Sequence, residues 1–211
     1  MFNSLGLAFA AAAILVTLSV PIGYLLSNRG GHRLSRALSA LAELPYALPG
    51  VVLSIACILL FLKPIPFTEV SIYGTVWIIL IAYLARFFSL ALRPVVSGFA
   101  QLDPGLEEAA RTCGAGLMFR LRTVLLSIIA PVAAAGGVLV FMTAFYEITV
   151  SALLWSSGSE TLGVLVYNLD DGGYTGMATA LATLIVGMVV IIMLLAELLA
   201  SRLPPGVLPW R

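Results

Sequence analysis

Side chains that could catalyse a reaction are scarce in this chain of 211 residues. The only lysine, Lys63, is followed by Pro64, so the phosphate-binding pattern GxxxxGK[ST] of an ATPase is absent. The only histidine, His32, lies among arginines, without the partners of a catalytic triad or a metal site. Neither Cys57 nor Cys113 belongs to a CxxC pair. The sequence therefore predicts a protein that is not an enzyme and that binds no metal or cofactor itself.

The charged residues with the most informative spacing lie in the longest polar segment. Asp103 and the proline after it are typical of a helix N-cap and first turn. Glu107 and Glu108 fall early in this helix, where the helix dipole favours carboxylates, and Gly114 or the glycine two residues later can end it. The sequence predicts a short helix over about residues 103–116. A separate ATPase could grip such a helix, and the alternative is an ordinary solvated connector.

The composition of the whole chain is typical of a membrane protein. Hydrophobic residues make up 61% of the chain and charged residues 10%, and the mean hydropathy is +1.10. Soluble domains carry about 25% charged residues, so a water-soluble enzyme is excluded. Eleven basic residues are balanced by ten acidic ones, which excludes a nucleic-acid partner.

Long gaps between charged residues mark the segments that can cross a bilayer, because about 20 apolar residues in a helix span its hydrocarbon core. Apolar and polar residues do not alternate in these gaps as they do in the strands of a membrane barrel. We therefore expect an all-α membrane protein whose residues 1–211 form a single domain. The five predicted spans cover about residues 4–28, 44–62, 70–92, 124–150 and 173–200.

The distribution of charge predicts the orientation, because short cytoplasmic loops are enriched in Lys and Arg. One side of the predicted bundle holds nine arginines: Arg29, Arg33, Arg36, Arg93, Arg111, Arg120, Arg122, Arg202 and Arg211. The other side holds Lys63 and four acidic residues: Glu69, Glu160, Asp170 and Asp171. We expect the N-terminus outside, the C-terminus inside, and the helix at 103–116 in the cytoplasm.

This predicted cytoplasmic helix carries a motif. Glu108, Ala109 and Ala110, with Gly114 after three further residues, resemble the EAA loop of inner-membrane permease subunits of binding-protein-dependent ABC importers. The family pattern continues nine residues later with an Ile-x-Leu-Pro-like element, which reads VLLS from Val124 onward and lacks the proline. The stretches LPYALPGVVLS, EITVSALLW and SETLGVLVYNL are most similar to permeases of the ferric-iron, thiamine and aminoethylphosphonate group.

The resemblance implies a permease subunit that forms a solute path through the bacterial inner membrane. Separate cytosolic subunits would bind ATP and Mg²⁺, and the EAA helix would dock in their cleft, so that Glu107 and Arg111 join the motif as candidate coupling residues. A second permease subunit and an extracytoplasmic solute-binding protein are also implied. The rival hypothesis is an ATP-independent secondary transporter or channel, which predicts inverted internal repeats. We find no convincing repeat in the sequence.

Three residues are candidates for the translocation path. Glu147, beside Tyr146, lies near the outer end of the fourth span, where an ionisable group usually faces a cavity or a partner. The alternative is an interfacial residue that reaches out to water. Pro49 weakens backbone hydrogen bonding at the start of the second span, where it either begins a helix or forms a hinge beside the inner gate.

Two further charged residues lie inside the predicted spans. Arg86 and Glu197 are each several residues from the cytoplasmic end of their helix, which places them at a similar depth. Burying both charges is less costly when they pair. We therefore predict a structural ion pair between the third and fifth spans.

Overall fold

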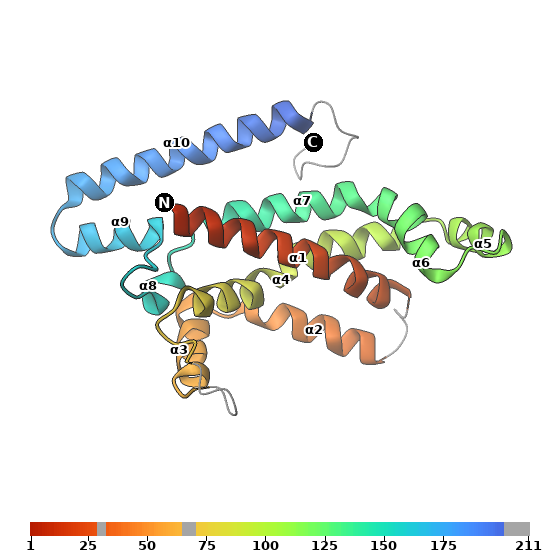
Figure 1. Ribbon diagram of the computed structural model, residues 1–211, viewed down its shortest axis with the longest axis horizontal. Coiled ribbons are helices and arrows are strands. Elements are labelled where there is room, and N and C mark those ends of the chain that lie inside the picture. The colour runs from red at the N-terminus through yellow and green to blue at the C-terminus, as the bar shows by residue number, and fades with distance from the viewer. Residues whose placement is uncertain (29–32, 65–70, 201–211) are drawn as a thin grey trace.

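The computed structural model describes residues 1–28, 33–64 and 71–200 (Figure 1). All regular secondary structure in these ranges is helical, as the sequence predicts. Several residues discussed above lie outside the described residues: Arg29, His32, Glu69, Arg202 and Arg211.

Within the described ranges, four helices are long and apolar enough to cross a membrane. They are α1 (Phe2–Asn28), α4 (Val76–Ala100), α7 (Leu126–Phe145) and α10 (Thr175–Ala200). They correspond to the first, third, fourth and fifth predicted spans. The third begins later than residue 70 and the fourth ends before residue 150, because turns flank both helices there.

The second predicted span, residues 44–62, differs from the expectation of one straight helix. It covers the end of α2 (Arg33–Ala47), a break, and all of α3 (Gly50–Phe61), and the two helices meet at 105°. The break falls at Pro49, which has no N–H to continue the helix and disfavours helical geometry in the residue before it. We call this bend the elbow.

A side-chain hydrogen bond of Ser54 attaches α3 to the rest of the molecule. The buried hydroxyl of Ser54 donates to the carbonyl oxygens of Gly50 at 2.9 Å and of Val150 at 3.1 Å. The first bond lies within α3, and the second reaches the segment that follows α7. This second contact positions α3 after the chain has turned away from α2.

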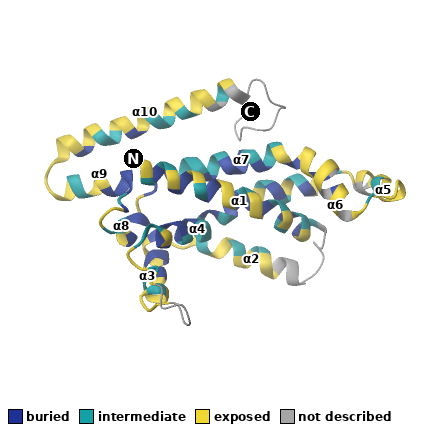
Figure 2. Ribbon diagram, in the orientation of Figure 1, coloured by how far each residue is buried: buried dark blue, intermediate teal, exposed yellow. Residues whose placement is uncertain are grey.

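Helices α1, α4 and α7 pack against one another and form the core, where buried residues concentrate (Figure 2). The largest fully buried side chains are aromatic and include Tyr83, Phe87 and Phe145. Gly136 on α7 permits a close approach, because a Cβ atom there would lie 3.2 Å from the carbonyl oxygen of Ala91 on α4. Small residues at such crossings are typical of membrane helix packing.

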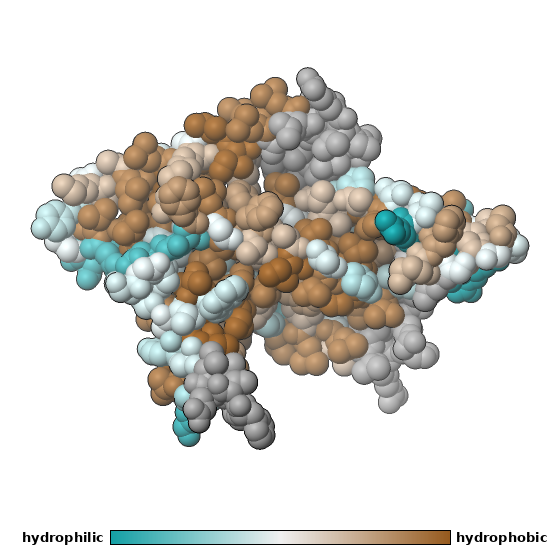
Figure 3. Space-filling view, in the orientation of Figure 1, coloured by the Kyte–Doolittle hydropathy of each residue, from teal (hydrophilic) through white to brown (hydrophobic). Residues whose placement is uncertain are grey.

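One end of this core carries the polar segment singled out in the sequence. Helices α5 (Pro104–Thr112) and α6 (Leu117–Phe119) project beyond the long helices (Figure 1). A six-residue π-helix, η1 (Arg120–Leu125), then leads into α7. In the space-filling view hydrophilic residues gather at this end, among other places, while hydrophobic residues cover much of the middle (Figure 3).

The opposite end is built from α8 (Ser151–Leu154), α9 (Leu162–Asp171) and the start of α1. The side-chain amide of Asn3 donates to the carbonyl oxygen of Gly158 at 2.9 Å. The hydroxyl of Ser4 accepts a hydrogen bond from the N–H of Leu162 at 2.7 Å. These bonds fasten the N-terminus to the loops between α8 and α9.

Helix α10 lies along the outside of the bundle (Figure 1), packs mainly beside α9 and contributes only Ile185 to the buried core cluster, with Leu181, Met188 and Val189 packed against it. Only 6% of its 18-residue apolar stretch is buried within the chain, compared with 50% for α4. A hydrophobic helix exposed in this way needs lipid or another protein around it.

Candidate functional site

Helix α5 has the caps that its sequence predicts. Asp103 is the N-cap, and its Oδ1 accepts a hydrogen bond at 2.9 Å from the backbone N–H two residues later. At the other end, the N–H of Ala115 donates to Ala110 at 3.0 Å and that of Gly114 donates to Arg111 at 2.9 Å, which is a Schellman motif. Gly114 has a φ of +77°, a value that glycine adopts without strain.

The structure brings the six candidate coupling residues together on this one short helix and its cap. Five lie in α5, from Glu107 to Arg111, and Gly114 follows its C-terminus. Glu108, Ala109, Arg111 and Gly114 are exposed, and Ala110 is half-buried. A rigid, exposed helix of this kind can be held in a groove of another protein.

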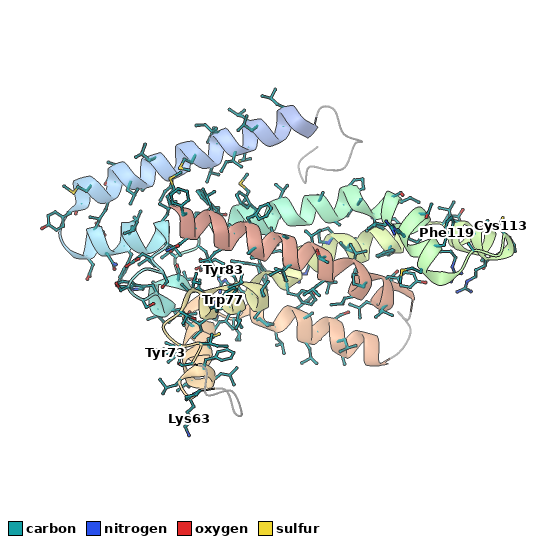
Figure 4. The ribbon with its side chains drawn as sticks, in the orientation of Figure 1. Lys63, Tyr73, Trp77, Tyr83, Cys113 and Phe119 are labelled. Carbon is teal, nitrogen blue, oxygen red and sulfur yellow. The ribbon has the colours of Figure 1, made fainter. Side chains whose placement is uncertain are left out.

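Sequence reasoning missed the apolar side chains beside these charges. Leu106, Met118 and Phe119 are 43%, 75% and 60% exposed. Figure 4 shows Phe119 with Cys113 at the α5 end, away from Lys63 at the tip of α3. Large apolar residues inside a polar connector were the signal that could have identified them. Together with α5 they provide an exposed apolar and charged surface, which is typical of a protein interface.

The π-helix η1 connects this surface to the long apolar helix α7. Here the family pattern has a proline and this chain has Ser127, which lies in α7 just after η1. The hydroxyl of Ser127 donates to the carbonyl oxygen of Thr123 at 2.8 Å. The helix therefore continues across the position of the missing proline, and its π-helical turn sets the start of α7.

Glu147 lies where α7 ends, and only 7% of it is exposed. Its carboxylate accepts hydrogen bonds from the N–H groups of Val150, at 3.0 Å, and Ser151, at 3.2 Å, and from the hydroxyl of Thr149. This arrangement differs from the interpretation of Glu147 as an interfacial residue that reaches out to water, and its place on the translocation path stays a prediction. Its neighbour Tyr146 is 51% exposed.

Arg86 lies at the elbow. Its Nη1 donates to the carbonyl oxygen of Leu48 at 3.3 Å, and Pro49 next to it is exposed and precedes α3 as its N-cap residue. Gly50 fits tightly here, because a Cβ atom would overlap Thr149 Oγ1 and lie 2.9 Å from Arg86 Nη1. The predicted hinge position and the span residue Arg86 therefore meet at one site.

The structure does not pair Arg86 with Glu197. Arg86 is directed to the elbow, whereas Glu197 lies near the end of α10, which packs mainly beside α9. Among the described residues the ion pair observed is Arg93 Nε with Glu43 Oε1, at 3.1 Å. A similar predicted depth in the membrane does not bring two side chains together when their helices are not direct neighbours.

Known proteins resemble the chain over most of its length. It is 30% identical over 169 residues to the ABC transporter permease protein y4fN of Sinorhizobium fredii, covering 78% of this chain and 29% of that protein. It is 26% identical over 151 residues to the protein named as 2-aminoethylphosphonate transport system permease PhnV of Salmonella paratyphi A, covering 72% of this chain and 56% of that one. The chain thus spans only part of these relatives.

The fold is also found in a solved structure. An inward-facing structure of the MetNI methionine ABC transporter superposes with a TM-score of 0.78 at 21% identity, covering 96% of this chain and 94% of that one. The family model described as "binding-protein-dependent transport system inner membrane component" matches residues 19–208. This multi-pass, all-helical chain therefore belongs to that family of inner-membrane proteins.

Proposed function

We propose that this chain is the permease subunit of an ATP-driven ABC importer, which forms a solute path and couples it to a separate ATPase. The observation that carries the proposal is α5, a short capped helix that projects from one end of the bundle. Family membership supports it. A projecting helix held by caps at both ends gives a motor protein a rigid element on which to act.

The proposal fixes an orientation. With α5 in the cytosol, the end formed by α8, α9 and the N-terminus faces the outside, and the C-terminus is inside. The placement of α5 and α9 at opposite ends supports this arrangement. ATP and Mg²⁺ would then bind on the cytosolic partner, which supplies the catalysis that this chain does not perform.

Two other protein partners complete the proposed importer. A solute-binding protein would deliver its cargo at the α8–α9 end. A second permease subunit, identical to this chain or different from it, would close the path, with lipid covering the remaining apolar surface. The exposed apolar residues of α10 support a covered face of this kind.

The proposed solute is one of those carried by the permease group that the sequence resembles: ferric iron, thiamine or a phosphonate. The relative named for 2-aminoethylphosphonate supports the phosphonate within this group. Transport of radiolabelled 2-aminoethylphosphonate into vesicles that hold the assembled importer tests this step. Uptake without any ATPase would instead favour the secondary transporter or channel.

The coupling role of α5 is tested by replacing Gly114. A valine is strained at a φ of +77° and would disrupt the Schellman motif. We expect Gly114→Val to reduce both the amount of ATPase that co-purifies from detergent and the ATP hydrolysis of the complex, by about tenfold for a loss of about 1.4 kcal/mol.

The matched control is Gly116→Ala. Gly116 is exposed, a Cβ atom added to it would meet nothing within 4 Å, and it is free of the positive φ found at Gly114. We expect this variant to retain the ATPase. If Gly114→Val also retained it at wild-type levels, the assignment of α5 as the docking element would be wrong.

A further inference from the structure

Arg86 carries a positive charge in the middle of a long apolar helix. It lies ten residues after the start of α4 at Val76, and α4 continues to Ala100, beyond the end of the predicted span at residue 92. At 1.5 Å per residue, Arg86 is about 15 Å from the first residue of α4, near the centre of a hydrocarbon core about 30 Å thick. A charged side chain at this depth is costly unless it faces a partner or a water-filled cavity.

The described part of the chain supplies no ion-pair partner for this charge. The ion pair observed there joins Arg93 and Glu43. Glu147 belongs to the turn that contacts the elbow at Gly50, but its carboxylate is held within that turn by two backbone N–H groups and a hydroxyl. No described carboxylate therefore binds Arg86.

One side of the Arg86 guanidinium is fixed by the elbow. Its Nη1 donates to the carbonyl oxygen of Leu48 at 3.3 Å, and it fits there because Gly50 has no Cβ atom, which would lie 2.9 Å away. Nε and Nη2 form no hydrogen bond with the described residues, and both remain accessible. These two nitrogens share one edge of the planar group, and such an edge matches two oxygens of a phosphonate, phosphate or carboxylate.

The break in the elbow is exposed at the same place. Leu48 and Pro49 lie outside α2 and α3, Leu48 is 40% exposed, and Pro49 is exposed as well. Non-helical backbone at membrane depth occurs where it is buried in protein or lines a water-filled cavity. In transporters, broken helices of this kind form solute sites. An exposed break beside an unpaired arginine therefore favours a position on the solute path.

We propose that Arg86 binds the anionic group of the transported solute at the elbow. The group is an oxyanion that accepts hydrogen bonds from Nε and Nη2, while the carbonyl oxygen of Leu48 keeps Nη1 in place. This inference rests on the proposed transport function and narrows it. A positively charged solute would be repelled by Arg86, so the phosphonate is the member of the proposed solute group that this site accepts.

The first experiment measures whether oxyanions cover Arg86 in the full-length chain in phosphatidylcholine nanodiscs. Phenylglyoxal modifies accessible arginines, and mass spectrometry of the digested chain follows each arginine separately. Saturating 2-aminoethylphosphonate or inorganic phosphate should slow the modification of Arg86 about tenfold, because the bound oxygens cover Nε and Nη2. Ethanolamine, which lacks the anion, should not protect it. Arg93, on the same helix and paired with Glu43, is the internal control and should react at an unchanged rate.

The second experiment measures uptake by the assembled importer in vesicles. Arg86→Gln should raise the KM for 2-aminoethylphosphonate about tenfold, and Arg86→Lys about threefold, because lysine keeps the charge but has no planar pair of donors. Arg93→Gln removes the same charge from the same helix and should keep the wild-type KM. If Arg86 served only to hold the elbow, its replacement would lower the Tm of the chain and leave the KM unchanged.

Together the experiments separate the anion site from the proposed function. Protection of Arg86 in a chain that supports no ATP-driven uptake would keep the site and contradict the importer. Uptake with a KM that Arg86→Gln leaves unchanged would keep the importer and overturn the site. Modification of Arg86 that oxyanions do not slow, or an Arg86 that phenylglyoxal does not reach, overturns the site as well. These last two results come from the wild type, so a variant that fails to fold does not affect them.

Discussion

The carboxylate of Glu147 determines how the chain leaves α7. It accepts hydrogen bonds from the N–H groups of Val150 and Ser151 and so begins the short helix α8. The sequence EITVS indicates an ionisable group near the end of a span, but the partners of that group are two backbone N–H groups and the hydroxyl of Thr149 in the turn that follows. Backbone direction after a helix end depends on tertiary packing, so the pattern alone did not predict this role.

Glu147→Gln should therefore lower stability. In the wild type, backbone N–H groups donate to both oxygens of the carboxylate. In the variant, the NH₂ group of the amide would face one of these donors, and an unsatisfied buried group costs about 1–3 kcal/mol. We expect a lower Tm of the purified chain in detergent. Glu160→Gln is the matched control, because the carboxylate of Glu160 accepts from the exposed N–H of Gly158 and is not buried. Loss of transport at unchanged Tm would contradict this structural role and favour the predicted place of Glu147 on the translocation path.

Among the elements, the elbow between α2 and α3 is the main departure from the sequence prediction. The gaps between charged residues show how long an apolar stretch is. The end of α2 and α3 together are long enough for one membrane span. Pro49 marked a weak point, but the 105° angle depends on contacts distant in sequence, such as Arg86 with Leu48. By contrast, α5 was predictable to within a few residues, because its caps are local.

Gly50→Ala should disturb the elbow. A methyl group there would overlap Thr149 Oγ1, so that a neighbouring side chain must move. Overpacking of this kind typically costs about 1–3 kcal/mol. We expect a lower Tm and weaker protection of α3 amides in hydrogen exchange.

The control for this variant is Gly187→Ala on α10, where a methyl group meets nothing within 4 Å. Alanine is also the better helix former, so its effect should be neutral or stabilising. Equal Tm values for the two variants would show that the elbow tolerates a side chain and that the tight fit has no energetic consequence.

For the whole molecule, the two native cysteines allow the orientation to be measured. Cys113 is exposed beside α5, and Cys57 is buried in α3. A membrane-impermeant maleimide should therefore label Cys113 in inside-out vesicles and leave it unlabelled in intact spheroplasts. Ser157→Cys, at an exposed position between α8 and α9, should show the opposite pattern in a Cys113→Ser background. Labelling of Cys113 from outside would reverse the proposed topology.

The packing of the long helices was less predictable than their number. Hydropathy identified four of them and the apolar length of the elbow pair. Hydropathy gave no information on which helices lie next to each other. The pairing of Arg86 with Glu197 was predicted without that information, and the structure directs Arg86 to the elbow. Helix contacts in a membrane depend on small residues such as Gly136 and on side-chain shape, which a charge count does not register.

The low burial of α10 has a consequence for which substitutions the chain can accept. Away from the face around Ile185 that packs on the core, this helix requires hydrophobic side chains but no particular side-chain shape. Exchanges among Leu, Ile, Val and Met should pass unnoticed along much of its length, whereas the same exchanges in α4 meet a filled interior. In this part of the molecule, the bilayer or a neighbouring protein within it constrains the sequence more than the interior of the chain does.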